Sequence, residues 1–414
     1  MNVRLTKQEK HWVLYDVGNS AFTLLVSTIM PIYFNYLAGN AGLSDVDYLA
    51  YWGYAASVST LLVALLGPVF GTMADNKGFK KPIFIGFLAV GAIGCISLGF
   101  AKQWLLFLVL FVIAKVGYSG SLIFYDSMLA DVTEPERMDD VSSKGYAWGY
   151  IGSCIPFVLS LAIVLGNEAI GISMGTAMAI AFCLNAAWWL VLTLPLLKHY
   201  KQTHYSEKRE HAFRDSFKVL YKTFTEIKSQ KHIFVFLLAF FFFIDGVYTI
   251  IDMATAFGSA LGFDSTMLLL ALLLTQIVAF PFALIFGRAA KKYSNVTLIK
   301  ICIAAYTCIA LFAIQLDQVW EFWLLAVCVG MFQGGIQAMS RSYFAKIIPS
   351  EKSGEYFGLY DICGKGAAFM GTTLVGVFTQ LTGSANAGIS VIAVIFIAGF
   401  FLFGKAAKLN AARE

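Results

Sequence analysis

Charged residues are scarce in this chain, and their scarcity excludes a soluble globular protein. Only 13% of the 414 residues are Asp, Glu, Lys or Arg, whereas soluble domains contain about 25%. Hydrophobic residues make up 59% of the chain, and the mean hydropathy is +0.73. This composition is typical of a polytopic membrane protein, whose partner is the lipid bilayer. The net charge of +5 belongs to the loops, so nucleic acid is not expected as a partner.

Cysteine and histidine are also few, and neither is arranged for chemistry. The seven cysteines lie inside apolar segments without metal-like or redox-like spacing, so we interpret them as small core residues. No zincin pair or nucleophile elbow is present, and no Ser or His has a plausible third catalytic partner. We therefore expect no catalytic residue, no metal, no cofactor and no enzymatic activity.

Long apolar runs dominate the chain and predict an all-α fold. A helix that spans a bilayer needs roughly 20 mostly apolar residues, and twelve runs meet this requirement. The first of them is too long for a signal peptide and lacks a cleavage site, so we expect it to be retained. The predicted spans are 12–38, 48–74, 82–101, 104–127, 142–166, 171–197, 232–261, 264–289, 296–316, 319–345, 354–381 and 386–409.

One long polar stretch, 198–231, divides the chain into halves at 1–197 and 232–414. Within it, apolar residues from Phe213 to Ile227 recur at helical spacing and face away from basic residues. This pattern predicts an amphipathic helix on an anionic membrane surface, or else a solvated linker helix. If the stretch and both termini are cytoplasmic, 26 of the 30 Lys and Arg residues lie on the inner side, as the positive-inside rule requires.

The two halves also repeat. Gly71 and Gly287 close the second helix of each half at an offset of 216 residues, and Asp126 corresponds to Arg341 at an offset of 215. Two groups of six helices joined by a long inner loop are typical of a transporter whose binding site lies at the midplane between them.

The loop after Gly71 carries a specific motif, Gly-Thr-Met-Ala-Asp-Asn-Lys-Gly-Phe-Lys-Lys. It resembles the loop signature of the major facilitator superfamily, which governs conformational change. Asp75 is therefore a candidate gate residue. The corresponding loop of the second half has Lys291 where the acid would stand.

Further motifs narrow the resemblance. They are Tyr15 to Phe22, Val141 to Gly152, Phe243 to Gly246, Gly334 to Ser342 and Gly358 to Lys365. Together they resemble the "unknown major facilitator" family, bacterial relatives of the fungal autophagy-linked vacuolar amino-acid effluxers. The resemblance implies a monomeric major facilitator fold in a bacterial plasma membrane that moves amino acids or related small metabolites.

Ionisable residues inside the predicted spans mark the candidate site, because each costs at least ~2.5 kcal/mol at a helix centre. They are Asp16, Asp126, Asp245, Asp252 and Asp361 against Lys115, Arg341 and Lys365. The negative excess favours proton uptake by a carboxylate, and both signs together suit a zwitterion. We assign proton coupling to Asp245, Asp252 and Asp16, although a helix-end cap also explains Asp16.

Lys115 and Asp245 both lie at mid-depth with opposite charge. We predict that they face each other across a central cavity and that cargo or a proton competes for the pairing. Asp361 and Lys365 are four residues apart with the acid first, which favours a structural pair within one helix. Asp126 and Arg341 are predicted to close the inner gate, or else to cap two separate helix ends.

The predicted substrate contacts combine these cations with polar side chains of neighbouring helices. They are Lys115, Tyr118, Asn19, Tyr248, Gln333, Gln337 and Lys365. The sequence thus predicts a proton-coupled, alternating-access transporter of a small polar or zwitterionic metabolite. The alternatives are a membrane sensor or scaffold that does not transport, and an uncoupled facilitator of another solute.

Overall fold

The computed structural model describes residues 4–206, 230–260, 262–382 and 385–413, and all its elements are helical. In the described part, twelve helices are long and apolar enough to cross a membrane. This agrees with the twelve predicted spans. The predicted amphipathic helix lies outside the described residues.

The first half of the chain begins with a spanning helix built from three pieces. These are α1 (Lys7–Leu24), a π-helical turn (Leu25–Ile29) and α2 (Met30–Asn40). Pro31 follows the π-helical turn and lacks an N–H, so it cannot complete the regular hydrogen-bond ladder there. The other elements of this half are α3 (Asp45–Ala74), α4 (Lys80–Leu98), α5 (Trp104–Ser127), short α6 (Leu129–Val132), a 3-10 turn (Pro135–Arg137), α7 (Met138–Leu165) and α8 (Met174–His199).

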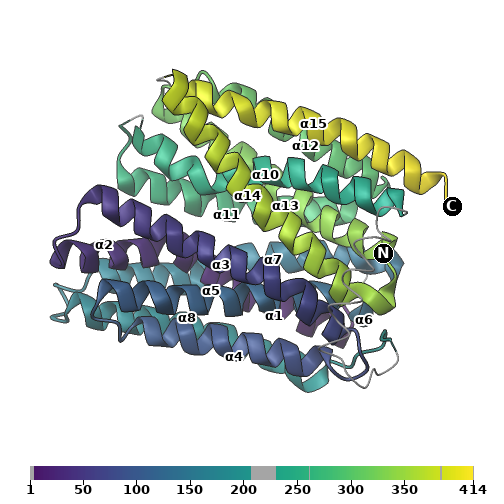
Figure 1. The fold of residues 1–414 in the computed structure, drawn as a ribbon, viewed down its shortest axis with the longest axis horizontal. Helices are drawn as coiled ribbons and strands as arrows, with labels where there is room; N and C mark the ends of the chain where they lie inside the picture. Colours follow the sequence, from purple (N-terminus) through teal and green to yellow (C-terminus); the bar gives the residue numbers. More distant parts are fainter. Residues whose placement is uncertain (1–3, 207–229, 261, 383–384, 414) are drawn as a thin grey trace.

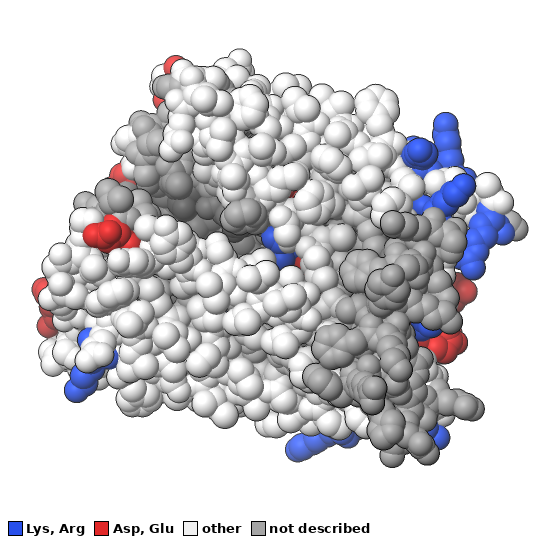
Figure 2. All heavy atoms as spheres, viewed as in Figure 1, with Lys and Arg blue, Asp and Glu red and all other residues white. Residues whose placement is uncertain are grey.

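The second half repeats this arrangement of helices. It contains α10 (Lys231–Ala260), α11 (Ser265–Ala289), α12 (Asn295–Ala313), α13 (Val319–Ile347), a 3-10 turn (Ser350–Lys352), α14 (Ser353–Thr382) and α15 (Ala385–Ala411). In Figure 1, α1 to α8 form one layer and α10 to α15 the other, and the two ends of the chain lie at the same end of the molecule. Lys and Arg side chains gather at that end in Figure 2, which we call the basic end.

Two equivalent seams join the halves. Helix α3 packs on α14, and α7 packs on α11. Glycines allow close approach at both seams: a Cβ atom on Gly71 would lie 2.3 Å from the Gly354 carbonyl oxygen, and one on Gly287 would lie 2.8 Å from the Ser143 Cβ atom. Gly71 and Gly287 are the repeat-related pair found in the sequence, so the repeat places one glycine of the pair in each seam.

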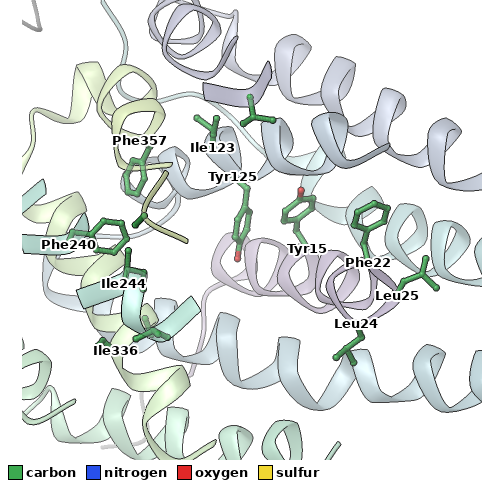
Figure 3. Packing of buried hydrophobic residues seen from close by; sticks show 14 of the residues in the cluster. Tyr15, Phe22, Leu24, Leu25, Ile123, Tyr125, Phe240, Ile244, Ile336 and Phe357 are labelled. Atoms are coloured by element: carbon green, nitrogen blue, oxygen red, sulfur yellow. The ribbon is translucent and has the colours of Figure 1, made fainter. Parts of the chain in front are cut away.

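The buried core continues through both layers. Figure 3 shows Tyr15 and Tyr125 side by side in the first half, with Phe240 and Phe357 in the second half. The ring centroids of Tyr15 and Tyr125 are 4.5 Å apart. The described ion pairs between the halves lie toward the basic end, and Figure 2 shows the surface hollowed between the layers toward the opposite end.

Candidate functional site

Arg341 lies at the centre of the contact between the halves. It extends from α13 and is 2% exposed, and its Nη1 atom donates to Asp126 Oδ1 of α5 at 3.0 Å. Its Nη2 atom lies 3.3 Å from Asp16 Oδ2 of α1. Its Nε atom donates to the Ser142 hydroxyl of α7 at 2.9 Å, and Nη2 also donates to the Ser142 carbonyl at 3.0 Å. One guanidinium therefore ties α13 to three helices of the first half.

Aromatic rings surround the same guanidinium. Its carbon lies 4.6 Å from the Trp12 ring, 5.5 Å from Tyr125 and 4.2 Å from Tyr146. Trp12 and Tyr125 stack on each other, and the Trp12 indole donates to the Tyr125 carbonyl. Cation–π contacts strengthen when water is excluded, so the rings stabilise Arg341 in its buried position.

The predicted contact between Asp126 and Arg341 is thus present, and Asp16 joins it rather than capping a helix. Asp16 also accepts from the amide of Asn19 at 3.4 Å. Sequence reasoning missed Ser142, Tyr146 and Trp12 as partners. Ser142 and Tyr146 lie in the recognised 141–152 motif, but that motif alone does not predict a contact with Arg341.

Asp75 forms a second contact, at the α3–α14 seam. Its Oδ1 atom accepts from the Gly354 N–H at 2.7 Å and its Oδ2 atom from the Glu355 N–H at 2.9 Å. These donors belong to the first turn of α14, where helix N–H groups lack partners within the helix. Burial raises the pKa of Asp75 to about 7, although Lys80 and the two N–H groups oppose the rise.

Lys80 connects this seam to the polar segment that follows α8. Its Nζ atom is buried and lies 3.2 Å from Asp131 and 2.9 Å from the Ser353 hydroxyl. Asp131 also accepts from Tyr200 and from the backbone of Thr203 and His204. Burial alone would raise the pKa of Asp131, but Lys80, Tyr200 and these donors together lower it.

A third contact between halves was missed entirely. Asp139 at the start of α7 accepts from Lys346 of α13 at 2.6 Å and from Asn295 of α12 at 2.7 Å. From the sequence alone, Lys346 is only one of the basic residues on the inner side. Neither helical spacing nor the repeat relates Asp139 to Lys346. The pair could therefore not be predicted from the sequence.

The predicted substrate contacts Tyr118, Lys115 and Lys365 lie farther from the basic end than the Arg341 cluster does. The Tyr118 hydroxyl is 2.6 Å from the Thr23 hydroxyl, which links α5 to α1. Asp361 and Lys365 form the predicted pair within α14, with Nζ 2.6 Å from Oδ2 and side chains 16% and 23% exposed. Lys115 lies on α5, with Nζ 5.6 Å from the Phe111 ring centre.

Three further predicted contacts come from α10 and α13. Tyr248 and Gln337 are half-buried. Gln333 is buried and lines a cavity of about 40 Å³ between α10, α11 and α13. Figure 2 shows a Lys or Arg side chain at the base of the hollow, so the hollow is not purely apolar.

Asp245 does not pair with Lys115 in this conformation. It is 0% exposed and accepts from the Gly371 N–H of α14 at 2.9 Å and from Thr249 at 3.3 Å. It therefore packs inside the second half, against α14, instead of facing the first half. The side chain of Asp252 lies outside the described residues. Within the described part of the chain, no cluster of three or more His, Cys, Asp or Glu residues could hold a metal ion.

Known proteins resemble this chain over nearly its whole length. The family described as "Vacuole effluxer Atg22 like" matches residues 6–414. The "Uncharacterized MFS-type transporter YxiO" of Bacillus subtilis is 42% identical over 97% of this chain and 95% of its own length. "Autophagy-related protein 22" of Saccharomyces cerevisiae is 24% identical over 92% of this chain and 88% of its own.

Solved structures share the fold at low identity. FucP, a major facilitator superfamily transporter in the outward conformation, superposes with a TM-score of 0.73, with 12% identity and 97% coverage of both chains. A bacterial homologue of the iron transporter ferroportin, in an outward-facing state, gives 0.69 with 14% identity over 98% of this chain and 100% of its own. The chain therefore belongs to the Atg22-like vacuole effluxer family and is a transporter with the major facilitator fold.

Proposed function

We propose that this transporter is a secondary active carrier that works by alternating access and moves a small polar or zwitterionic metabolite, such as an amino acid, together with protons. One observation carries the proposal. The cluster of Arg341, Asp16 and Asp126 joins the two halves at the basic end, and the surface between the layers is hollowed toward the opposite end. A carrier needs such a cluster, because a bound solute must be sealed from one side while it is open to the other.

The two equivalent seams support alternating access. If the basic end is cytoplasmic, this conformation faces outward, and rocking 1–197 against 232–414 opens the inner side. That motion breaks the contacts of Arg341 and the hold of Asp75 on the start of α14. The linker, 198–231, is long enough to leave both halves free to rock.

The charges at mid-depth support a zwitterionic cargo. Lys115 and Lys365 supply cations for a carboxylate, and Asp361 supplies an anion for an ammonium group. Tyr118, Tyr248, Asn19, Gln333 and Gln337 complete the proposed contacts. The resemblance to the fungal vacuolar amino-acid effluxers makes amino acids the first solutes to examine.

Proton coupling is assigned to Asp245, with Asp252 and Asp16 as alternatives. Asp245 is buried, and its Oδ2 atom has no hydrogen-bond partner among the described residues. A buried carboxylate without a cation partner is costly when charged, so neutralisation by a proton is the low-cost form. We place the monomeric carrier in a bacterial plasma membrane with both termini in the cytoplasm.

Counterflow into proteoliposomes tests the proposal. Vesicles loaded with a mixture of the common amino acids should accumulate at least one labelled amino acid. Lys115→Gln should abolish the accumulation, and Lys102→Gln, which removes an exposed lysine outside the hollow, should not. Counterflow of none of them would overturn the proposed cargo class. Thermal stabilisation by an amino acid without any flux would instead favour a sensor.

A further inference from the structure

Asp245 occupies a site that is built wholly within the second half. Its Oδ1 atom accepts two hydrogen bonds, one from the Gly371 peptide N–H of α14 and one from the Thr249 hydroxyl one turn along α10. Its Oδ2 atom is buried and has no hydrogen-bond partner in the described part of the chain. An N–H inside an α-helix normally donates to the carbonyl four residues earlier, so its contact with a side chain of another helix is unusual.

Only glycine fits at position 371. A Cβ atom there would lie 2.3 Å from Asp245 Oδ1 and 2.2 Å from the Thr249 hydroxyl oxygen. Both distances are far shorter than van der Waals contact. The absence of a side chain is therefore what allows the α14 backbone to reach the carboxylate.

No charged group competes for Asp245 among the described residues. The charged residues on the helices that pack on α10 are Arg288, Lys300, Glu321, Arg341, Lys346, Glu355, Asp361, Lys365, Lys405 and Lys408. Asp361 and Lys365 pair with each other, Arg341 pairs with Asp16 and Asp126, and Lys346 pairs with Asp139. None of these groups contacts the Asp245 carboxylate, so its charged form depends on the two donors.

We propose that Gly371 and Thr249 are positioning residues for Asp245: they hold its charged form, and a proton on Oδ2 weakens the hold of α10 on α14. This inference rests on the proposed assignment of proton coupling to Asp245. A charged carboxylate accepts stronger hydrogen bonds than a neutral acid does. Protonation therefore loosens α14 at Gly371 without any contact with the first half.

Helix α14 can carry this change to the cargo site and the gate. Lys365 is six residues from Gly371, or about 9 Å along the helix, and Gly354 is about 26 Å away at the end that Asp75 holds. One helix thus links the proton site, the proposed cargo pair and the contact between the halves.

Infrared titration of the purified protein in lipid tests the inference without a substrate. The carboxylic-acid band that Asp245→Asn removes belongs to Asp245, and its intensity is followed across a pH series. Gly371→Ala should move the midpoint upward by about one to two pH units, because a hydrogen bond to a charged group is lost. Gly376→Ala is the matched control on the same helix, since a Cβ atom there meets nothing within 4 Å.

Thr249→Val is the second variant, because it keeps the side-chain volume and removes only one donor. It should shift the midpoint in the same direction by a smaller amount, even if Gly371→Ala does not fold. A titrating band with an unchanged midpoint in both variants would overturn the inference and leave Asp245 as the proton carrier. No titrating band for Asp245 in the wild type would refute the proton assignment itself, and the inference with it.

Discussion

Replacing Arg341 by Gln should open the basic end of the molecule. The change removes one cation from a cluster whose side chains are 2% exposed for Arg341, 7% for Asp16 and 19% for Asp126. Breaking one member of a buried ion pair costs about 3 to 5 kcal/mol. We take the lower value, because Asp126 is partly exposed and water can replace some of its interaction.

A cost of about 3 kcal/mol shifts an equilibrium by roughly 100-fold. If about 99 of 100 molecules begin in the closed form, this shift leaves about half of them closed. The penalty falls mainly on the closed form, because opening the basic end returns both carboxylates to water.

Distances between spin labels measure this equilibrium directly. Labels at Glu136 and Lys292, both exposed at the basic end on opposite halves, are introduced after replacement of the seven native cysteines. Arg341→Gln should add a population at longer distance, and Arg288→Gln, which removes an exposed arginine at the end of α11, should not. A folded Arg341→Gln protein with the wild-type distance distribution would refute the assignment of Arg341 to the gate.

Three further predictions concern charge, pH and topology. The double variant Asp126→Arg with Arg341→Asp should recover part of the transport that either single change loses. If the double variant transports no better than the worse single variant, the two residues do not act as a pair. Burial raises the pKa of Asp75 to about 7, so the closed form binds this proton more tightly than the open form. Its contribution to closing is full below the ordinary carboxyl pKa and is lost as pH rises through about 7. The label distance should therefore lengthen from acid to alkaline pH, and Asp75→Asn should flatten this response. A single cysteine at Ser44, between α2 and α3, should react with an impermeant reagent from outside only, and reaction from inside alone would reverse the predicted topology.

The spans could be predicted from the sequence because lipid imposes one simple requirement on each of them. Every span needs a long apolar run, and the predicted ranges agree with the helices to within a few residues. The interruption at Leu25–Ile29 was not predicted. The π-helical turn there depends on how the backbone hydrogen bonds of the helix rearrange around Pro31. The start of α7 at Met138 also lies before the predicted residue 142, since its polar first turn carries Asp139 and Asp140.

The site could be predicted only in part. The repeat related Asp126 to Arg341 because both lie at equivalent helix ends, and helical spacing alone specified the pair of Asp361 and Lys365. Partners on different helices follow from tertiary packing, which no spacing encodes. For this reason Asp245 was expected opposite Lys115 but lies against Gly371, where the absence of a side chain provides the contact.

Proton movement during cargo exchange decides whether this carrier couples its cargo to protons. Vesicles containing the purified protein and a pH-sensitive dye are given an amino acid that shows counterflow, with no pH gradient imposed. We expect amino-acid movement to drive a measurable pH change, and Asp245→Asn to exchange the same amino acid without one. Wild-type amino-acid flux with no proton movement would contradict proton coupling and leave an uncoupled facilitator.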